Sequence, residues 1–182
     1  MDYLPIFIDL KERHCLVVGG GEIAARKAAL LLKAQANVTL IAPEIAETSR
    51  QLLNDPDYRG KVKWITAHFS ADYLDEQSLI IAATDDEQVN QAVYQAAKAR
   101  KILVNVADQP EMCDFILPSV LDRSPIVVAI SSGGKSPILA RQLRARLETL
   151  IPPAYGKLAQ LAGRYRQRVK AKFSQLSQRR RF

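Results

Sequence analysis

The residues best placed to do chemistry are closely spaced glycines followed by a small residue. Gly19, Gly21 and Ala24 have the spacing G-x-G-x-x-A. They lie between the apolar run 15–18 and the Ala- and Leu-rich segment 22–32. In such a motif the first glycine permits a tight turn, the second lets a pyrophosphate approach the backbone, and the helix that follows offers N–H groups to phosphates. The motif predicts a dinucleotide site; a glycine turn in a nucleotide-free domain is the alternative.

An acidic residue follows the glycines at the distance expected for ribose recognition. Glu44 comes after a second β-branched run, 38–42, about 20 residues beyond the last glycine. A carboxylate there accepts hydrogen bonds from a ribose diol and repels a 2′-phosphate. No arginine directly follows Glu44. We therefore expect NAD rather than NADP.

Several loops that leave predicted strands should meet at one edge of a parallel sheet, where ligands of open α/β sheets bind. Thr84, in one of these loops, could offer a hydroxyl to the nicotinamide ribose. Helix capping by Thr84 and Asp85 is the alternative. The converging loops are 19–23, 43–44, 84–86 and 105–108.

Asp108 is the residue that we expect to carry the proton chemistry. It follows the predicted strand 102–106 at the ligand edge, near the reactive end of the cofactor. A carboxylate there can accept a proton or hold a cation transiently. An Asx-type turn within 108–110 is the alternative.

A hairpin and a second polar loop follow the sheet region. We expect strands at 115–117 and 126–130 joined by a turn at 121–125, and then a helix from the N-cap Ser136 to Leu150. An isolated hairpin is marginal in water, so a second subunit is a natural partner. The loop before this helix could bind carboxylates or could be an ordinary connection, and its polar residues are Ser131, Ser132 and Lys135.

The composition favours a globular, non-membrane protein. The chain has 182 residues, of which 48% are hydrophobic and 25% charged, enough for one large or two small domains. No apolar run reaches membrane-spanning length, and the start lacks the basic flank of a signal peptide, so we expect the cytoplasm. Two cysteines and two histidines, without C-x-x-C or helical metal spacing, predict neither a disulfide framework nor a resident metal.

Positive charge accumulates toward the end of the chain. The formal net charge is +7, and no acidic residue follows Glu148. The basic residues fall on a predicted last helix, about 154–178, interpreted either as a surface for a polyanion or as a solvated helical face. They include Lys157, Arg164, Arg166, Arg168, Lys170, Lys172 and Arg179 to Arg181.

The order of elements predicts an open, mainly parallel sheet wrapped by helices. A short extended piece at 4–8 is expected to pack beside the sheet edge. Further strands are expected at 62–65 and 79–83, and further helices at 45–53 and 87–100.

Six segments spread over the chain add a more specific signal. They are LPIF at 4–7, VVGGGEIAARK at 17–27, IAATDD at 81–86, NVAD at 105–108, FILPS at 115–119 and SSGGKSP at 131–137. Together they resemble siroheme synthase, in its precorrin-2 dehydrogenase/sirohydrochlorin ferrochelatase module. The match extends over essentially the whole chain.

This resemblance implies NAD-dependent oxidation of precorrin-2 to sirohydrochlorin, then insertion of ferrous iron, as substrate, to give siroheme. It implies a homodimer that binds tetrapyrroles and neither nucleic acid nor membrane. The fold expected is an α/β Rossmann-type parallel sheet at 1–113, a small α+β dimerisation domain at 114–150 and a basic helical region at 151–182. By similarity, Asp108 is the essential aspartate, as general base and transient metal-handling group. By similarity, Glu22, Ile23, Pro43 and Glu44 line the NAD site, and Ser132 lies in the tetrapyrrole-facing loop. To these the sequence patterns add Gly19, Gly21 and Thr84 for the cofactor and Asn105 and Lys135 for the substrate.

Alternatives remain open at this point. Many family members continue into a uroporphyrinogen-III methyltransferase domain, so the chain is either part of a longer trifunctional enzyme or a stand-alone form. Some relatives oxidise without chelating. Outside the family, the candidates are an NAD-sensing regulatory module with a basic nucleic-acid-binding tail and an NAD-dependent oxidoreductase for a small acidic substrate.

Overall fold

The computed structural model describes residues 2–172 and divides the chain into two compact units. The first is Met1–Ile116 and the second is Leu117–Phe182. Within residues 2–172, no helix combines the length and the apolar character needed to cross a bilayer.

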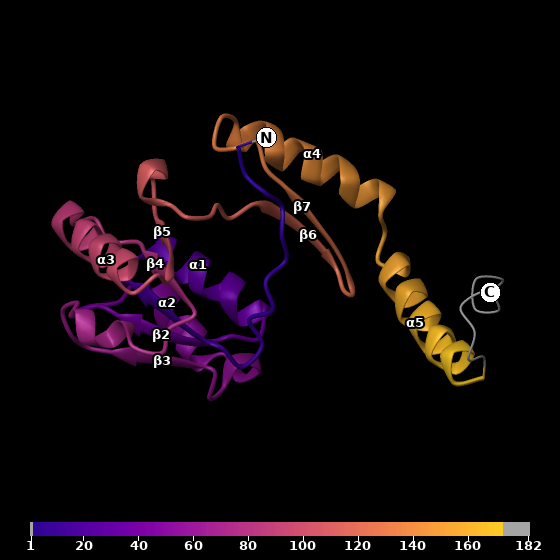
Figure 1. Ribbon diagram of the computed structural model, residues 1–182, viewed down its shortest axis with the longest axis horizontal. Coiled ribbons are helices and arrows are strands. Elements are labelled where there is room, and N and C mark those ends of the chain that lie inside the picture. The colour runs from indigo at the N-terminus through magenta and orange to yellow at the C-terminus, as the bar shows by residue number, and fades with distance from the viewer. Residues whose placement is uncertain (1, 173–182) are drawn as a thin grey trace. The chain divides into compact units, whose positions relative to one another are not determined.

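The first unit is built on a five-stranded sheet in the order β3-β2-β1-β4-β5, with every neighbouring pair parallel (Figure 1). Strands β1 and β4 are almost wholly buried, as is typical of parallel strands covered on both faces. The order reverses between β1 and β4, the point at which such sheets bind ligands. This confirms the predicted Rossmann-type sheet, whose strands are β1 (His14–Val18), β2 (Asn37–Ile41), β3 (Val62–Ile65), β4 (Leu79–Ala82) and β5 (Leu103–Val106).

Three α-helices belong to this unit: α1 (Glu22–Lys33), α2 (Glu47–Asn54) and α3 (Glu87–Ala99). They begin within about two residues of the predicted starts, the usual uncertainty of helix ends. Between β3 and β4 the chain makes only a short 3₁₀-helix at Ala71–Leu74. One core cluster lies between α3 and one face of the sheet, where Val93 and Ala97 are buried together with the strand residues Leu16, Val18, Ile80, Ala82, Val104 and Val106.

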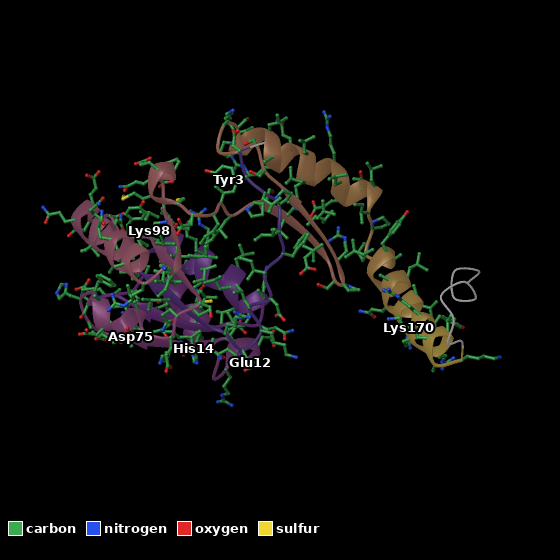
Figure 2. All side chains as sticks on the ribbon, viewed as in Figure 1. Tyr3, Glu12, His14, Asp75, Lys98 and Lys170 are labelled. Atoms are coloured by element: carbon green, nitrogen blue, oxygen red, sulfur yellow. The ribbon has the colours of Figure 1, made fainter. Side chains whose placement is uncertain are left out.

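The outer edge of β5 is covered by the segment that leaves it, residues 113–115, which we call the edge segment. The Asp114 N–H donates to the Val104 carbonyl at 2.8 Å, and the Asp114 carboxylate accepts from the Val104 N–H at 3.1 Å. Lys98, labelled in Figure 2, adds an ion pair to Asp114 at 2.6 Å. The predicted strand at 115–117 is therefore wrong: the backbone and the side chain of Asp114 satisfy the edge of β5, and no strand forms at 115–117.

The second unit contains an antiparallel hairpin of β6 (Ser119–Arg123) and β7 (Ile126–Ile130). The predicted turn at 121–125 is wrong in extent, because Leu121 to Arg123 pair with β7 and the chain turns at Ser124 and Pro125. Two helices follow, α4 (Pro137–Leu150) and α5 (Ala154–Lys172). The predicted cap is confirmed, since Ser136 Oγ accepts from the Leu139 N–H at 3.3 Å. The rest of the predicted last helix, 173–178, and Arg179 to Arg181 lie outside the described residues.

The N-terminal piece at 4–8 forms no strand. Its apolar side chains are exposed, Leu4 at 73%, Ile6 at 64% and Phe7 at 75%. The expectation that this piece packs beside the sheet edge is therefore wrong. Nothing in its sequence alternates with the period of a strand, and its backbone joins no ladder.

Candidate functional site

The turn between β1 and α1 is held tightly against the ends of both neighbouring strands. Gly19 has a φ of +127°, which side-chain-bearing residues rarely adopt, and its N–H donates to the Ile41 carbonyl at 2.9 Å. A Cβ on Gly19 would lie 2.2 Å from the Ala83 carbonyl oxygen. Glycine is therefore required here for two reasons, the backbone angle and the close approach of the loop after β4.

The next glycine joins this turn to the loop after β2. The Gly20 carbonyl accepts hydrogen bonds from the Ala46 N–H at 2.8 Å and from Ser49 Oγ at 3.0 Å. A Cβ on Gly20 would lie 2.1 Å from the Glu44 carbonyl oxygen, so the Glu44 backbone lies directly against the glycine turn. The fully buried Ser49 was not singled out from the sequence, because a lone serine in a polar helix carries no signal of its partner.

Gly21 differs from its two neighbours because its surroundings are open. A Cβ there would meet nothing within 4 Å. Gly21 is the N-cap of α1, and no side chain caps that helix. The first N–H groups of α1 therefore face free space with the positive end of the helix dipole behind them, and Glu22 and Ile23 beside them are exposed. This cradle fits the phosphates of a dinucleotide.

The loop after β4 is fixed by a buried asparagine. Asn90 is 3% exposed; its Oδ1 accepts from Thr84 Oγ1 at 3.0 Å and its Nδ2 donates to the Thr84 carbonyl at 2.9 Å. The cap of α3 is Asp86, which accepts from two helix N–H groups at 2.8 and 3.2 Å. Capping by Asp85 is therefore wrong by one residue. Thr84 is half-buried in this network, and its contact with the nicotinamide ribose stays a prediction.

Asp108 lies two residues beyond β5 at the same edge of the sheet. Its φ is +58°, a left-handed conformation that Asp tolerates better than most residues. The side chain is exposed, and within the part of the chain that the structure describes its carboxylate accepts no hydrogen bond. Since Ala107 N–H donates to the Ala82 carbonyl, the Asp108 loop adjoins the loop after β4. The carboxylate is thus not occupied by an Asx turn and faces solvent.

A lysine that sequence reasoning did not single out lies close to this loop. Lys27 of α1 is half-buried, and its Nζ donates to Asn105 Oδ1 on β5 at 3.0 Å. Burial lowers the pKa of the Lys27 ammonium, while the nearby Cys113 and Asp108 side chains oppose that shift. Helical spacing could have indicated that Lys27 lies on the buried face of α1. It is three residues after Ala24 and four before Leu31, and both of these residues are buried.

Asn105 is held inside the protein. It is 5% exposed; besides the bond from Lys27, its Nδ2 donates to the Phe115 carbonyl at 2.8 Å and contacts Cys113 Sγ at 3.3 Å. All its amide positions thus have protein partners. Direct contact of Asn105 with a substrate stays a prediction.

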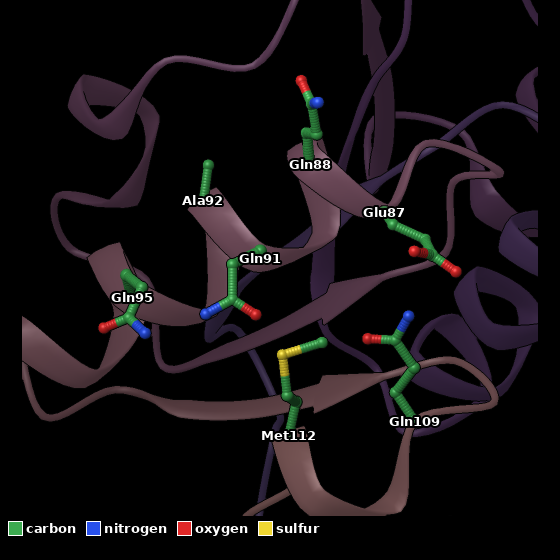
Figure 3. A pocket seen from close by; sticks show the side chains of 7 residues that line it. All are labelled: Glu87, Gln88, Gln91, Ala92, Gln95, Gln109 and Met112. Atoms are coloured by element: carbon green, nitrogen blue, oxygen red, sulfur yellow. The ribbon is translucent and has the colours of Figure 1, made fainter.

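A hollow of about 480 Å³ lies between α3 and the segment after Asp108 (Figure 3). Amide side chains surround most of it, and Met112 contributes an apolar wall. None of the predicted site residues lines it. Its lining consists of Glu87, Gln88, Gln91, Ala92, Gln95, Gln109 and Met112.

The remaining predicted residues belong to the second unit. Ser131 Oγ accepts from the Gly133 N–H at 2.9 Å, and Ser132 Oγ accepts from the Ser136 N–H at 2.8 Å. Lys135 is exposed in the same loop. A tetrapyrrole role for Ser132 and Lys135 stays a prediction. Among residues 2–172, no group of three or more His, Cys, Asp or Glu side chains could hold a metal ion.

Comparison with known proteins adds a family to this geometry. Residues 6–119, which contain the sheet, match the model of a family described as putative NAD(P)-binding. The chain belongs to this family. Residues 123–150 match the model described as sirohaem biosynthesis protein central, and residues 154–182 match the sirohaem synthase dimerisation region.

Similar proteins support the resemblance seen in the sequence. Siroheme synthase of Nitrosospira multiformis is 54% identical over 182 residues, and that of Nitrosococcus oceani is 53% identical over 182 residues. Both matches cover 100% of this chain, which spans only 39% and 38% of the two relatives. The predicted resemblance to siroheme synthase is confirmed.

One solved structure is similar over almost the entire chain. It is SirC, precorrin-2 dehydrogenase, with a TM-score of 0.83 and 25% sequence identity. The match covers 98% of this chain and 86% of that chain. The chain therefore has the fold of a precorrin-2 dehydrogenase.

Proposed function

We propose that the chain oxidises precorrin-2 to sirohydrochlorin with NAD and then inserts ferrous iron to give siroheme, acting in the cytoplasm as a homodimer. The oxidation is proposed because an open dinucleotide cradle and a carboxylate without a hydrogen bond from residues 2–172 lie at one edge of the sheet, in a chain with the fold of SirC. The relatives of similar sequence are siroheme synthases, which favours this pathway over a regulatory nucleic-acid-binding module.

The cofactor site is built from two loops. The uncapped start of α1 would hold the pyrophosphate, and Gly21 leaves the space it needs. The exposed Glu44, beside the glycine turn, would accept hydrogen bonds from the ribose diol, and its charge disfavours a 2′-phosphate. When bound, NAD supplies a hydride acceptor. The match to an NAD(P)-binding family supports the site but does not choose between the two dinucleotides.

Asp108 has a proton to accept in each step. Oxidation of precorrin-2 removes two hydrogens from the macrocycle, one as hydride and one as a proton. Entry of Fe²⁺ into sirohydrochlorin displaces two pyrrole protons. An exposed carboxylate that accepts no hydrogen bond from the described residues can take up these protons and return them to solvent. A dehydrogenase without chelatase activity is the second candidate, because the solved structure that matches 98% of this chain is described as a precorrin-2 dehydrogenase.

Dimer formation is proposed from the second unit. Residues 154–182 match a dimerisation region. Exposed apolar side chains on α4 and α5 offer surface for a second copy, as expected of an incomplete small unit. They are Ile138, Leu139, Leu143, Leu150, Tyr155, Leu158, Leu161 and Tyr165.

The test is anaerobic absorbance spectroscopy with precorrin-2, with NAD, NADP or neither, followed by ferrous iron. The variants Asp108→Asn and Asp108→Gly both tolerate the left-handed backbone, which alanine would strain. Glu111→Gln is the control, an exposed carboxylate three residues further along.

We expect NAD-dependent formation of sirohydrochlorin by wild type, and a rate lower by about 10²–10⁴-fold in both Asp108 variants. Glu111→Gln should match wild type. Unchanged rates in Asp108→Gly would remove Asp108 from the mechanism. No NAD-dependent conversion by wild type would refute the dehydrogenase, whereas iron insertion no faster than the uncatalysed reaction would refute the chelatase alone.

A further inference from the structure

Lys27 occupies an unusual place for a charged side chain. It lies on α1 among buried residues, with Ala24 three positions before it and Ala28 directly after it. Its Nζ reaches across to β5, where it donates to Asn105 Oδ1 at 3.0 Å, between residues 78 positions apart in sequence. The helix that would hold the cofactor is thereby bonded to β5, the strand that leads into the Asp108 loop.

This bond determines how the Asn105 amide is oriented. Since Val104 and Val106 pack in the cluster with α3, the alternation of a strand places Asn105 on the opposite face, toward Lys27. An ammonium can only donate, so the amide oxygen must face Lys27 and the NH₂ group must face the edge segment. There it donates to the Phe115 carbonyl at 2.8 Å and to Cys113 Sγ at 3.3 Å.

The same contacts close the loop that bears Asp108. Cys113 Sγ accepts from the Val106 N–H at 3.3 Å and lies 3.2 Å from the Val106 carbonyl and 3.3 Å from the Gln109 carbonyl. Burial raises the pKa of the Cys113 thiol, which favours the S–H that these carbonyls need. Both ends of the loop 106–113 are thus held together, with Asp108 between them.

We propose that Lys27 is a positioning residue, which orients Asn105 and so holds the Asp108 loop in its working conformation. The inference rests on the proposed function in assigning that loop to catalysis. The lowered pKa of Lys27, caused by burial, is consistent with a charge kept here for a purpose other than stability.

The first test does not depend on any substrate. The rate of Cys113 alkylation per thiolate, taken from its pH dependence and located by mass spectrometry, reports how firmly the loop is closed, because the Lys27 charge by itself lowers the pKa of this thiol. The other cysteine, Cys15, is 0% exposed. Lys27→Met removes the donor, Lys27→Arg keeps it, and Lys33→Met changes an exposed lysine at the end of the same helix. We expect alkylation about tenfold faster in Lys27→Met, and wild-type rates in Lys33→Met. Equal rates in Lys27→Met and wild type would overturn the proposal.

The second test separates positioning from binding. In Lys27→Met we expect kcat of the oxidation to fall about 10- to 100-fold, with KM for precorrin-2 unchanged and most activity restored in Lys27→Arg. In an Asn105→Ala background, Lys27→Met should cause little further loss, because both residues act along one path. A raised KM with unchanged kcat would mean that Lys27 contacts substrate instead, and full additivity would mean that it does not act through Asn105.

The two tests fail in distinguishable ways. If wild type does not oxidise precorrin-2, the proposed function is refuted, but the alkylation rates still decide whether Lys27 holds the loop. If Lys27→Met does not fold, Lys27→Gln takes its place in both measurements, because an amide can accept as well as donate and therefore no longer fixes the orientation of Asn105.

Discussion

Two adjacent glycines should respond in opposite ways to the same substitution. In Gly20→Ala the new methyl would lie 2.1 Å from the Glu44 carbonyl oxygen and 3.0 Å from the Ala42 Cβ, so backbone must move. In Gly21→Ala it would meet nothing within 4 Å, and the native φ of −78° suits alanine. The first change should therefore damage the fold, and the second should affect only a ligand that occupies the open space.

The magnitudes follow from these distances. Overpacking against backbone costs about 1–3 kcal/mol, which for a chain of this size lowers Tm by about 2–12 °C in Gly20→Ala. In Gly21→Ala, the lower entropy of the unfolded chain and the poorer N-cap offset each other within about 1 kcal/mol. The same 1–3 kcal/mol of overpacking, now against a bound pyrophosphate, weakens NAD binding about 5- to 150-fold.

Thermal denaturation and calorimetric titration with NAD measure both quantities on the same samples. The expected pattern is a lower Tm for Gly20→Ala, and a wild-type Tm with a raised Kd for Gly21→Ala. A wild-type Kd in Gly21→Ala would show that the dinucleotide does not approach this glycine, and the cradle at α1 would have to be abandoned. A wild-type Tm in Gly20→Ala would contradict the packing of Glu44 against the turn.

Two further predictions concern stability. Burial raises the pKa of the Cys15 thiol from 9.0 to about 11, so above pH 9 the unfolded chain loses a proton that the folded chain keeps. The stability advantage of wild type over Cys15→Ala is thus fully present below about pH 8. It should shrink by about 2 kcal/mol between about pH 8 and about pH 10.5, measured by urea denaturation. A difference in stability that stays constant over this range would contradict the prediction. Asn90→Ala leaves the Thr84 backbone N–H and carbonyl without their hydrogen-bond partner, Asn90. This change should lower the free energy of unfolding by about 1–3 kcal/mol, measured by thermal denaturation. The control Gln95→Ala, at an exposed position of the same helix, should lower it by no measurable amount.

The features that sequence predicted well are those whose signal is local. The glycine turn, the apolar strands and the cap at Ser136 each depend on residues within a few positions, and they formed as expected. The mainly parallel sheet was predictable as well, because apolar runs separated by short helices permit few topologies.

The features that sequence missed depend on partners far along the chain. Lys27 donates to Asn105, which is 78 positions away, and the residues around Lys27 give no indication of this partner. The expected strand at 115–117 does not form, because the side chain and backbone of Asp114 make the hydrogen bonds at the outer edge of β5. Patterns of apolar residues do not predict such side-chain bonds. The roles of Asp108 and Ser132 come from resemblance and chemistry and await experiment.

The edge segment also bears on how the chain behaves while it is being made. A bare outer strand of a parallel sheet invites pairing with another molecule, which is a common start of aggregation. Here the groups that cover β5 lie only seven to ten residues further along the chain. The covering groups thus leave the ribosome almost together with the strand, and closing so short a loop costs little entropy. Nascent chains should therefore bury this edge before a neighbouring copy can add to it.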